Sequence, residues 1–144
     1  MDMTAAVAAL LREEYPECVV LTGEPGAGGS TPKPFIELRE LSGSRQSMLG
    51  RRYRRQALLV LRYVPAEAPS PTPENAVSGM TDRLYSLMVS VALPGGGLLK
   101  GSGMSHERVD GTLLFKWGAA YDGIEVGQEP PLMRSLQEEV VTNG

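Results

Sequence analysis

The sequence predicts an α+β fold in which a mostly antiparallel sheet carries two helices on one face. Two segments show helical spacing of apolar residues, while the segments around them show the valine-rich runs or the alternation typical of strands. The expected order is helix, two strands, a long strand, a helix and a hairpin. We expect residues 1–123 to form a single α+β domain and residues 124–144 to form a C-terminal arm.

The composition bounds the class of protein. The chain has 144 residues, of which 42% are hydrophobic and 22% charged, with a net charge of −3, as in one soluble globular domain. Dedicated duplex-binding domains are usually basic, so the net charge counts against that class. There is no apolar run of about 18 residues for a membrane span, nor a basic leader typical of a signal peptide. We therefore expect no membrane contact, and assembly in the cytoplasm.

The first predicted helix covers residues 4–15. Val7, Leu10 and Leu11 follow the i, i+3, i+4 spacing of an amphipathic helix, and Pro16 ends it. The single cysteine comes shortly afterwards, beside an apolar run, and we expect a small buried thiol there rather than a nucleophile.

Strands and connections alternate up to residue 64. Residues 18–22 and 35–41 read as strands, separated by a loop rich in glycine and proline. Residues 42–50 are polar and are expected to form a connection. Residues 51–64 form the long strand, polar on both faces at its start and apolar in its middle. We expect its second half to be buried on both faces.

Residues 65–73 form a proline-rich linker, and the second predicted helix begins at its end. Thr72 suits the N-cap, Pro73 the first helical position and Glu74 the first turn. A continuous apolar stripe follows, and Pro94 ends it. The stripe consists of Val77, Met80, Leu84, Leu87, Met88 and Val91.

A hairpin closes the predicted domain. Its strands are residues 98–109 and 112–121, and Asp110-Gly111 between them fits a two-residue type I′ turn, in which both residues take positive φ. The polar segment that follows has few apolar anchors. They are Leu132, Met133 and Leu136.

No stretch offers a credible catalytic, cofactor or metal site. Residues 23–30 nearly spell a phosphate-binding loop, but Gly29 stands where the essential lysine belongs, so a flexible loop is expected. His106 is the only histidine. On a strand it points away from Glu107, which argues against a metal or acid-base cluster. The chain is therefore expected not to be an enzyme.

The basic cluster at the start of the long strand is the main candidate site. It comprises Arg51, Arg52, Tyr53, Arg54 and Arg55. Three interpretations stay open. The arginines could bind carboxylates of a neighbouring subunit, as arginine often does at interfaces. They could bind a nucleic-acid backbone while the tyrosine stacks on a base. They could also form a solvated face. Candidate acids for the first interpretation are Glu13, Glu14, Glu125, Glu129, Glu138 and Glu139.

The chain resembles a family of phage tail terminator proteins from phages and prophage-like elements of Gram-positive bacteria. Two motifs carry the resemblance, one around the arginine cluster and one in the hairpin, and together with the helices and the tail they cover nearly the whole chain. In the hairpin, Arg108 stands where the family pattern has an aliphatic residue. The matching residues are Leu49, Gly50, Arg51, Arg52, Tyr53, Arg55, Tyr63 and Pro65, then Gly101, Met104, Glu107, Val109, Asp110, Gly111, Leu113 and Phe115.

The resemblance implies a structural role in a virion tail or tail-like particle. Members of such families assemble as rings, commonly hexamers, which cap the tail tube, stop its polymerisation and face the head-side connector, or the last sheath ring in a contractile tail. On this basis the arginine cluster and the arm with Leu132, Met133 and Leu136 are candidate subunit contacts, and the partners are the chain itself and the tube protein. The alternative is a small nucleic-acid-binding protein that uses Arg51–Arg55.

Overall fold

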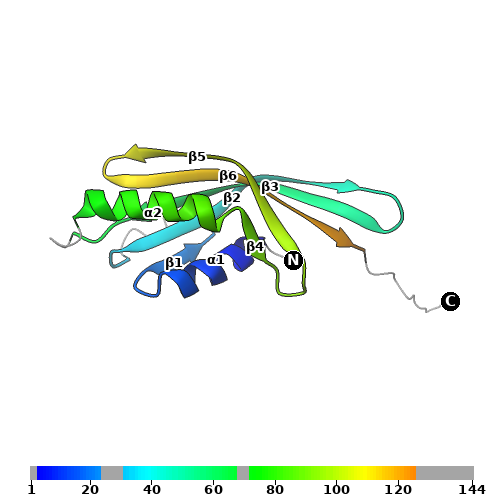
Figure 1. The fold of residues 1–144 in the computed structure, drawn as a ribbon, viewed down its shortest axis with the longest axis horizontal. Coiled ribbons are helices and arrows are strands. Elements are labelled where there is room, and N and C mark those ends of the chain that lie inside the picture. The colour runs from blue at the N-terminus through cyan, green and yellow to red at the C-terminus, as the bar shows by residue number, and fades with distance from the viewer. Residues whose placement is uncertain (1–2, 24–30, 68–71, 126–144) are drawn as a thin grey trace. The chain divides into compact units, whose positions relative to one another are not determined.

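The computed structural model describes residues 3–23, 31–67 and 72–125, and these form two helices and six strands (Figure 1). The α+β class expected from the sequence is confirmed. The elements in chain order are α1 (Met3–Glu14), β1 (Val19–Thr22), β2 (Phe35–Ser47), β3 (Arg52–Val64), α2 (Pro73–Leu87), β4 (Ser90–Ala92), β5 (Leu98–Val109) and β6 (Thr112–Ile124).

The six strands form one sheet in the order β1-β2-β3-β6-β5-β4. The expected antiparallel pairing holds for β4 with β5 and for β5 with β6. The sheet is nevertheless partly parallel, because β1 and β2 pair in parallel, with Val19 opposite Phe35 and Thr22 opposite Leu38. Twelve residues separate these two strands in the sequence, and a connection of that length can carry the chain back to the end of the sheet where β1 began, so that β2 runs in the same direction.

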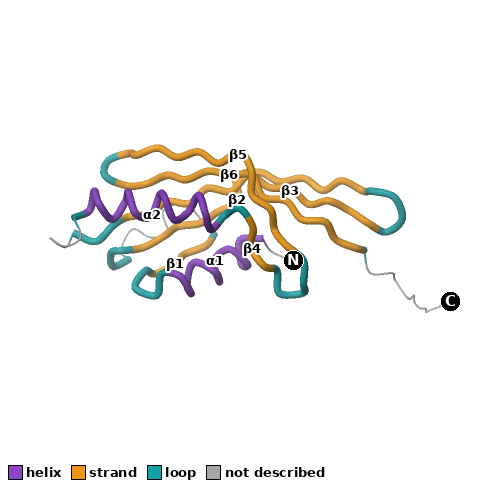
Figure 2. Tube along the Cα trace, in the orientation of Figure 1, coloured by secondary structure: helices purple, strands orange, loops and turns teal. Residues whose placement is uncertain are grey.

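Two segments differ from the sequence-based expectation. Residues 42–47 belong to β2 and not to a polar connection (Figure 2). Their side chains are exposed, so the strand there is specified by pairing with β3 and not by burial. The second helix ends at Leu87, and Val91 lies in β4 instead of continuing the helical stripe. Val91 is buried in β4, and a buried residue is also what an apolar helical stripe leads one to expect, so its apolar character does not distinguish helix from strand.

The described chain divides into two compact units. The first comprises residues 3–44 and 56–121, and the second comprises residues 45–55 and 122–125. We call the second unit the arginine hairpin. It contains the turn between β2 and β3 with the adjoining strand ends, and the end of β6, which runs to Ile124 and so three residues further than expected.

The core of the first unit lies on one face of the sheet. Along β3 and β6 the odd-numbered residues between 57 and 63 and between 113 and 121 are buried, with Trp117 only 1% exposed. The opposite face is only partly covered. Leu58 is 40% exposed and Arg62 is half-buried, so the expected burial of β3 on both faces is wrong at these positions.

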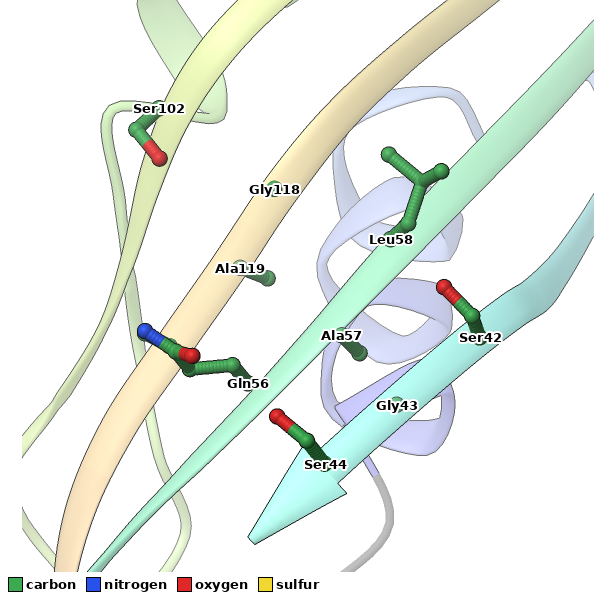
Figure 3. A pocket seen from close by; sticks show the side chains of 10 residues that line it. Ser42, Gly43, Ser44, Gln56, Ala57, Leu58, Ser102, Gly118 and Ala119 are labelled. Carbon is green, nitrogen blue, oxygen red and sulfur yellow. The ribbon is translucent and has the colours of Figure 1, made fainter. Parts of the chain in front are cut away.

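Both helices cover the same face of the sheet. Tyr85 of α2 packs edge to face on Phe115 of β6, with ring centroids 5.1 Å apart, and its hydroxyl lies 2.8 Å from Nδ1 of His106 on β5. In the view of the opposite face in Figure 3, α1 lies behind the strands. α2 thus packs on Phe115 of β6 through Tyr85.

The predicted N-cap of α2 and the predicted type I′ turn of the last hairpin are confirmed. The Thr72 hydroxyl oxygen accepts a hydrogen bond from the Asn75 backbone N–H at 3.2 Å, as an N-cap does. Asp110 and Gly111 have φ of 51° and 76°, as a type I′ turn requires. Arg108, the departure from the family pattern, donates to the Ser78 hydroxyl of α2 at 2.6 Å.

The cysteine is buried, as expected. Burial raises the pKa of the Cys18 thiol to about 11, with a smaller contribution from the charge of Glu17. The group therefore stays a thiol at neutral pH, which suits a packing role and not that of a nucleophile.

Gly101 is required by close packing at the start of β5. Its N–H donates to the Val89 carbonyl oxygen at 3.0 Å, and a Cβ added here would collide with the Met88 carbonyl oxygen. Gly101→Ala is therefore expected to destabilise the protein by about 1–3 kcal/mol, because backbone and not a flexible side chain would have to move. Urea denaturation followed by circular dichroism measures the change.

A glycine in open space provides the matched control. Gly79 lies inside α2, and a Cβ there would meet no atom within 4 Å. Gly79→Ala is expected to stabilise the protein by about 0.5–1 kcal/mol, since alanine favours the helix. Equal effects of the two substitutions would contradict the packing argument for Gly101.

Candidate assembly interface

The arginine hairpin places a leucine and two arginines at an exposed turn. Gly50 has a φ of 73°, which favours glycine, and the Met48 N–H donates to the Arg52 carbonyl oxygen at 2.8 Å. Leu49 precedes this glycine and is 94% exposed, and the exposed Arg51 and Arg52 follow the glycine. A side chain as apolar as leucine gains most from this position if a partner covers it.

Arg54 already has a carboxylate partner in its own chain. Its Nε and Nη2 donate to the two carboxylate oxygens of Asp122 at 2.8 and 3.3 Å. This two-pronged hydrogen bond raises the pKa of Arg54. The pair is exposed to solvent, so its role is to fix the side chain rather than to add much stability.

Tyr53 is held by contacts within the arginine hairpin. A Cβ at Gly123 would lie 2.5 Å from Cζ of Tyr53, so the ring occupies the space that a larger residue on β6 would fill. The Arg45 guanidinium lies 3.9 Å from the ring centroid, and its Nη2 is 3.6 Å from Oε2 of Glu125. These contacts argue against Tyr53 as a platform for stacking a nucleic-acid base.

The charge of the arginine hairpin is strongly positive. It holds five arginines against two carboxylates among the described residues, a net formal charge of +3 in a chain whose total is −3. Arg51 and Arg52 are exposed, and within the described ranges neither side chain has a hydrogen bond or ion pair. Arg55 is half-buried. Arg51 and Arg52 are therefore the arginines best placed to meet an external partner.

The structure brings the predicted cluster together with residues that the sequence did not single out. Asp122 and Gly123 come from β6, nearly 70 residues along the chain, and Arg45 comes from β2. The spacing of residues along the sequence does not reveal contacts between strands that lie so far apart in the chain. The predicted arm residues Leu132, Met133 and Leu136 lie outside the described residues, as does most of the glycine-rich loop, residues 24–30.

A shallow groove of about 350 Å³ lies on the open face of the sheet in the first unit (Figure 3). None of its lining residues titrates, so the groove itself supplies no acid, base or charged ligand. Ser102 and Gly118 are opposite each other in the β5–β6 register. The full lining is Ser42, Gly43, Ser44, Gln56, Ala57, Leu58, Ser102, Gly118, Ala119 and Ala120.

The remaining candidate chemistry concerns metal ligands, the histidine and membrane-spanning helices. In the part of the chain that the structure describes, no three His, Cys, Asp or Glu side chains are grouped as a metal site would need. His106 is engaged by Tyr85 of α2. No helix in the described ranges has the length and apolar character to cross a membrane.

The fold and the arginine hairpin define a small α+β protein whose most distinctive surface suits contact with another macromolecule. Comparison with family models matches residues 2–131 to the phage tail terminator protein model, and the chain belongs to this family. The resemblance seen in the sequence is thereby confirmed. It is a family of structural proteins that act in tail completion, and not of enzymes, which makes the chain a component of a virion tail. A comparison with curated proteins finds no match.

Proposed function

We propose that the chain forms a ring, a hexamer, that caps the tail tube, stops its polymerisation and presents a surface to the head-side connector. The match to the tail terminator model over residues 2–131 carries this proposal. In a contractile particle the same ring would meet the last sheath ring. A ring closes only through a heterologous interface, in which each subunit contributes two different patches.

The first patch is the exposed tip of the arginine hairpin. Leu49 supplies apolar area, and Arg51 and Arg52 supply charge without a partner in the described chain. Arginine is enriched among the residues that dominate interface energetics, and the exposed leucine beside it adds apolar area that a partner can cover. The tip is then buried against the neighbouring subunit.

The second patch has to be acidic to receive the tip. Of the acids that the sequence suggested, Glu14 already binds Arg83 at 2.6 Å and Glu125 lies beside Arg45. Glu13 on α1 is exposed and has no ion pair among the described residues. We therefore place the receiving surface at α1, with Glu13 as the described carboxylate that faces the arginines of the neighbour.

The C-terminal segment supplies a further contact in this proposal. Its apolar residues Leu132, Met133 and Leu136 would anchor it on a neighbour or on the tube, and its acids Glu129, Glu138 and Glu139 would add to the acidic surface. Deletion of residues 126–144 separates the two roles, since loss of rings points to the neighbour and loss of tube binding alone points to the tube.

The proposal is tested by the oligomeric state of the protein and by its place on a tube. Native mass spectrometry of the full chain is expected to give a hexamer. Electron microscopy with the tail tube protein is expected to give rings seated at one end of each tube. A chain that stays monomeric and never associates with a tube end would overturn the proposal.

A further inference from the structure

The sheet of the first unit exposes backbone on both of its edges. β1 ends at Thr22, opposite Leu38, so from Arg39 onward β2 has a described strand neighbour only on its β3 side. β4 covers β5 only from Leu98 to Lys100, and Gly101 adds one hydrogen bond to Val89. The outer edge of β5 beyond Gly101 faces no strand among the described residues. Exposed strand edges are templates for pairing with another strand.

The two strands that carry these open edges, β2 and β5, run in opposite directions. In the arginine hairpin, Arg54 binds Asp122 while the Glu125 N–H donates to the Arg51 carbonyl oxygen, so β3 and β6 are antiparallel. β5 and β6 are also antiparallel, and the turn of four residues between β2 and β3 makes that pair antiparallel. It follows that β2 and β5 are antiparallel, as they would be if β5 of one copy paired with β2 of the next in a continuous sheet.

The charges on the two edges are complementary on each face. Arg39 follows the buried Leu38 and so faces away from the helices, and Glu107 shares that face with its register partner Leu114. On the helix face, Glu40 alternates with Arg39, and Arg108 reaches Ser78 of α2. With Arg39 opposite Glu107 in an antiparallel pair, Glu40 and Arg108 become diagonal neighbours. Opposite charges at such positions favour pairing.

We propose that the copies of this chain join edge to edge, with β2 from Arg39 to Ser44 pairing antiparallel with β5 from Ser102 to Glu107 of the next copy. This inference rests on the proposed ring, because only a closed ring uses both edges of every copy. It adds to the proposed contact between the tip and α1 a shared sheet of about five residue pairs, roughly 16 Å long. The two edges differ, which is what a head-to-tail ring requires.

Amide hydrogen exchange tests the pairing directly. Peptides that cover residues 39–44 and 102–107 are expected to exchange at least about tenfold more slowly in the assembled ring than in the dilute, dissociated chain. Rings in which both segments exchange as fast as in the single chain would overturn the pairing and leave the proposed ring intact. Slow exchange at only one edge would also overturn it, because another partner would then hold that edge.

Exchanging the charges of the two edges provides a second test of the pairing. Arg39→Glu and Glu107→Arg are each expected to raise the concentration at which rings dissociate by at least about tenfold, and the double variant is expected to restore it. Glu13 belongs to the other proposed patch, so the control is Asp82→Arg on the exposed surface of α2, which should leave rings unchanged. A double variant as defective as the single ones would contradict the register. Failure of the unmodified chain to form rings would instead overturn the proposed function.

Discussion

Replacing Arg51 and Arg52 together with glutamate is expected to abolish ring formation and to leave the fold intact. Both side chains are exposed, and neither has a hydrogen bond or ion pair with the described residues, so the substitutions break no such interaction in the folded subunit. In the ring, each reversed charge would face a carboxylate of the neighbour. Close charge pairs of this kind are worth about 2–5 kcal/mol when disrupted, which weakens association by at least about 30-fold. Native mass spectrometry measures the loss.

Reversing two positive charges elsewhere on the subunit distinguishes the loss of a local contact from the effect of the changed net charge. Lys33→Glu with Lys100→Glu changes the total charge by the same amount at two positions outside the proposed contacts; Lys33 lies in an exposed ion pair whose loss costs little, and Lys100 is exposed. This control is expected to form rings. If the two double variants behave alike, the tip is not a specific contact and its assignment as an interface is wrong.

Trp117→Ala is expected to cause the largest loss of stability of any single substitution considered. Trp117 is buried at the centre of the face that the helices cover, and its ring centroid lies 5.3 Å from that of Phe115. Removing the indole leaves a cavity at the aromatic cluster that also holds Tyr85. Such truncations cost about 3–5 kcal/mol, a large part of the stability of a domain this size. Urea denaturation followed by far-ultraviolet circular dichroism measures it.

Trp117→Phe serves as the control, because it keeps an aromatic ring and most of the buried area. Its cost should be clearly smaller than that of alanine. If both variants unfold at the same urea concentration as the unmodified protein, the aromatic cluster is not the centre of the core. Exchange of the buried amides of β6 should rise in parallel with the loss of stability.

Much of the fold follows from local chemistry that a sequence displays. The N-cap and first turn of α2 depend on Thr72 and Pro73, and the final hairpin turn depends on Asp110 and Gly111, so the sequence predicts the start of α2 and this turn correctly. The alternation of Phe115 and Trp117 likewise predicts which face of β6 is buried. In each case the determining residues are neighbours in sequence.

The elements that sequence reasoning missed depend on distant partners. Residues 42–47 are polar and exposed, and only their pairing with β3 makes them a strand. Val91 fits the helical stripe of α2, but the chain there turns to pair with β5 as β4. The direction of β1 relative to β2 has no local signal, since the twelve-residue connection permits a parallel pair as well as a hairpin.

In the candidate site too, the sequence shows the local feature and the structure shows the contacts between distant residues. Arg51 to Arg55 form an evident basic cluster in the sequence, but the sequence does not distinguish their roles. The structure separates Arg54, bound to Asp122, and Tyr53, packed against Gly123, from the exposed Arg51. These contacts join residues nearly 70 positions apart, and therefore no spacing rule predicts them.

The length of tail tubes grown with this protein tests the central proposal most directly. Tube protein that polymerises alone should give tubes of broad length that continue to grow. Adding the chain during growth should arrest elongation, shorten the tubes in proportion to the amount added, and leave a ring at one end of each, whereas the Arg51→Glu/Arg52→Glu variant should not. Tubes that continue to elongate at the same rate in the presence of assembled rings would contradict a role in tail termination.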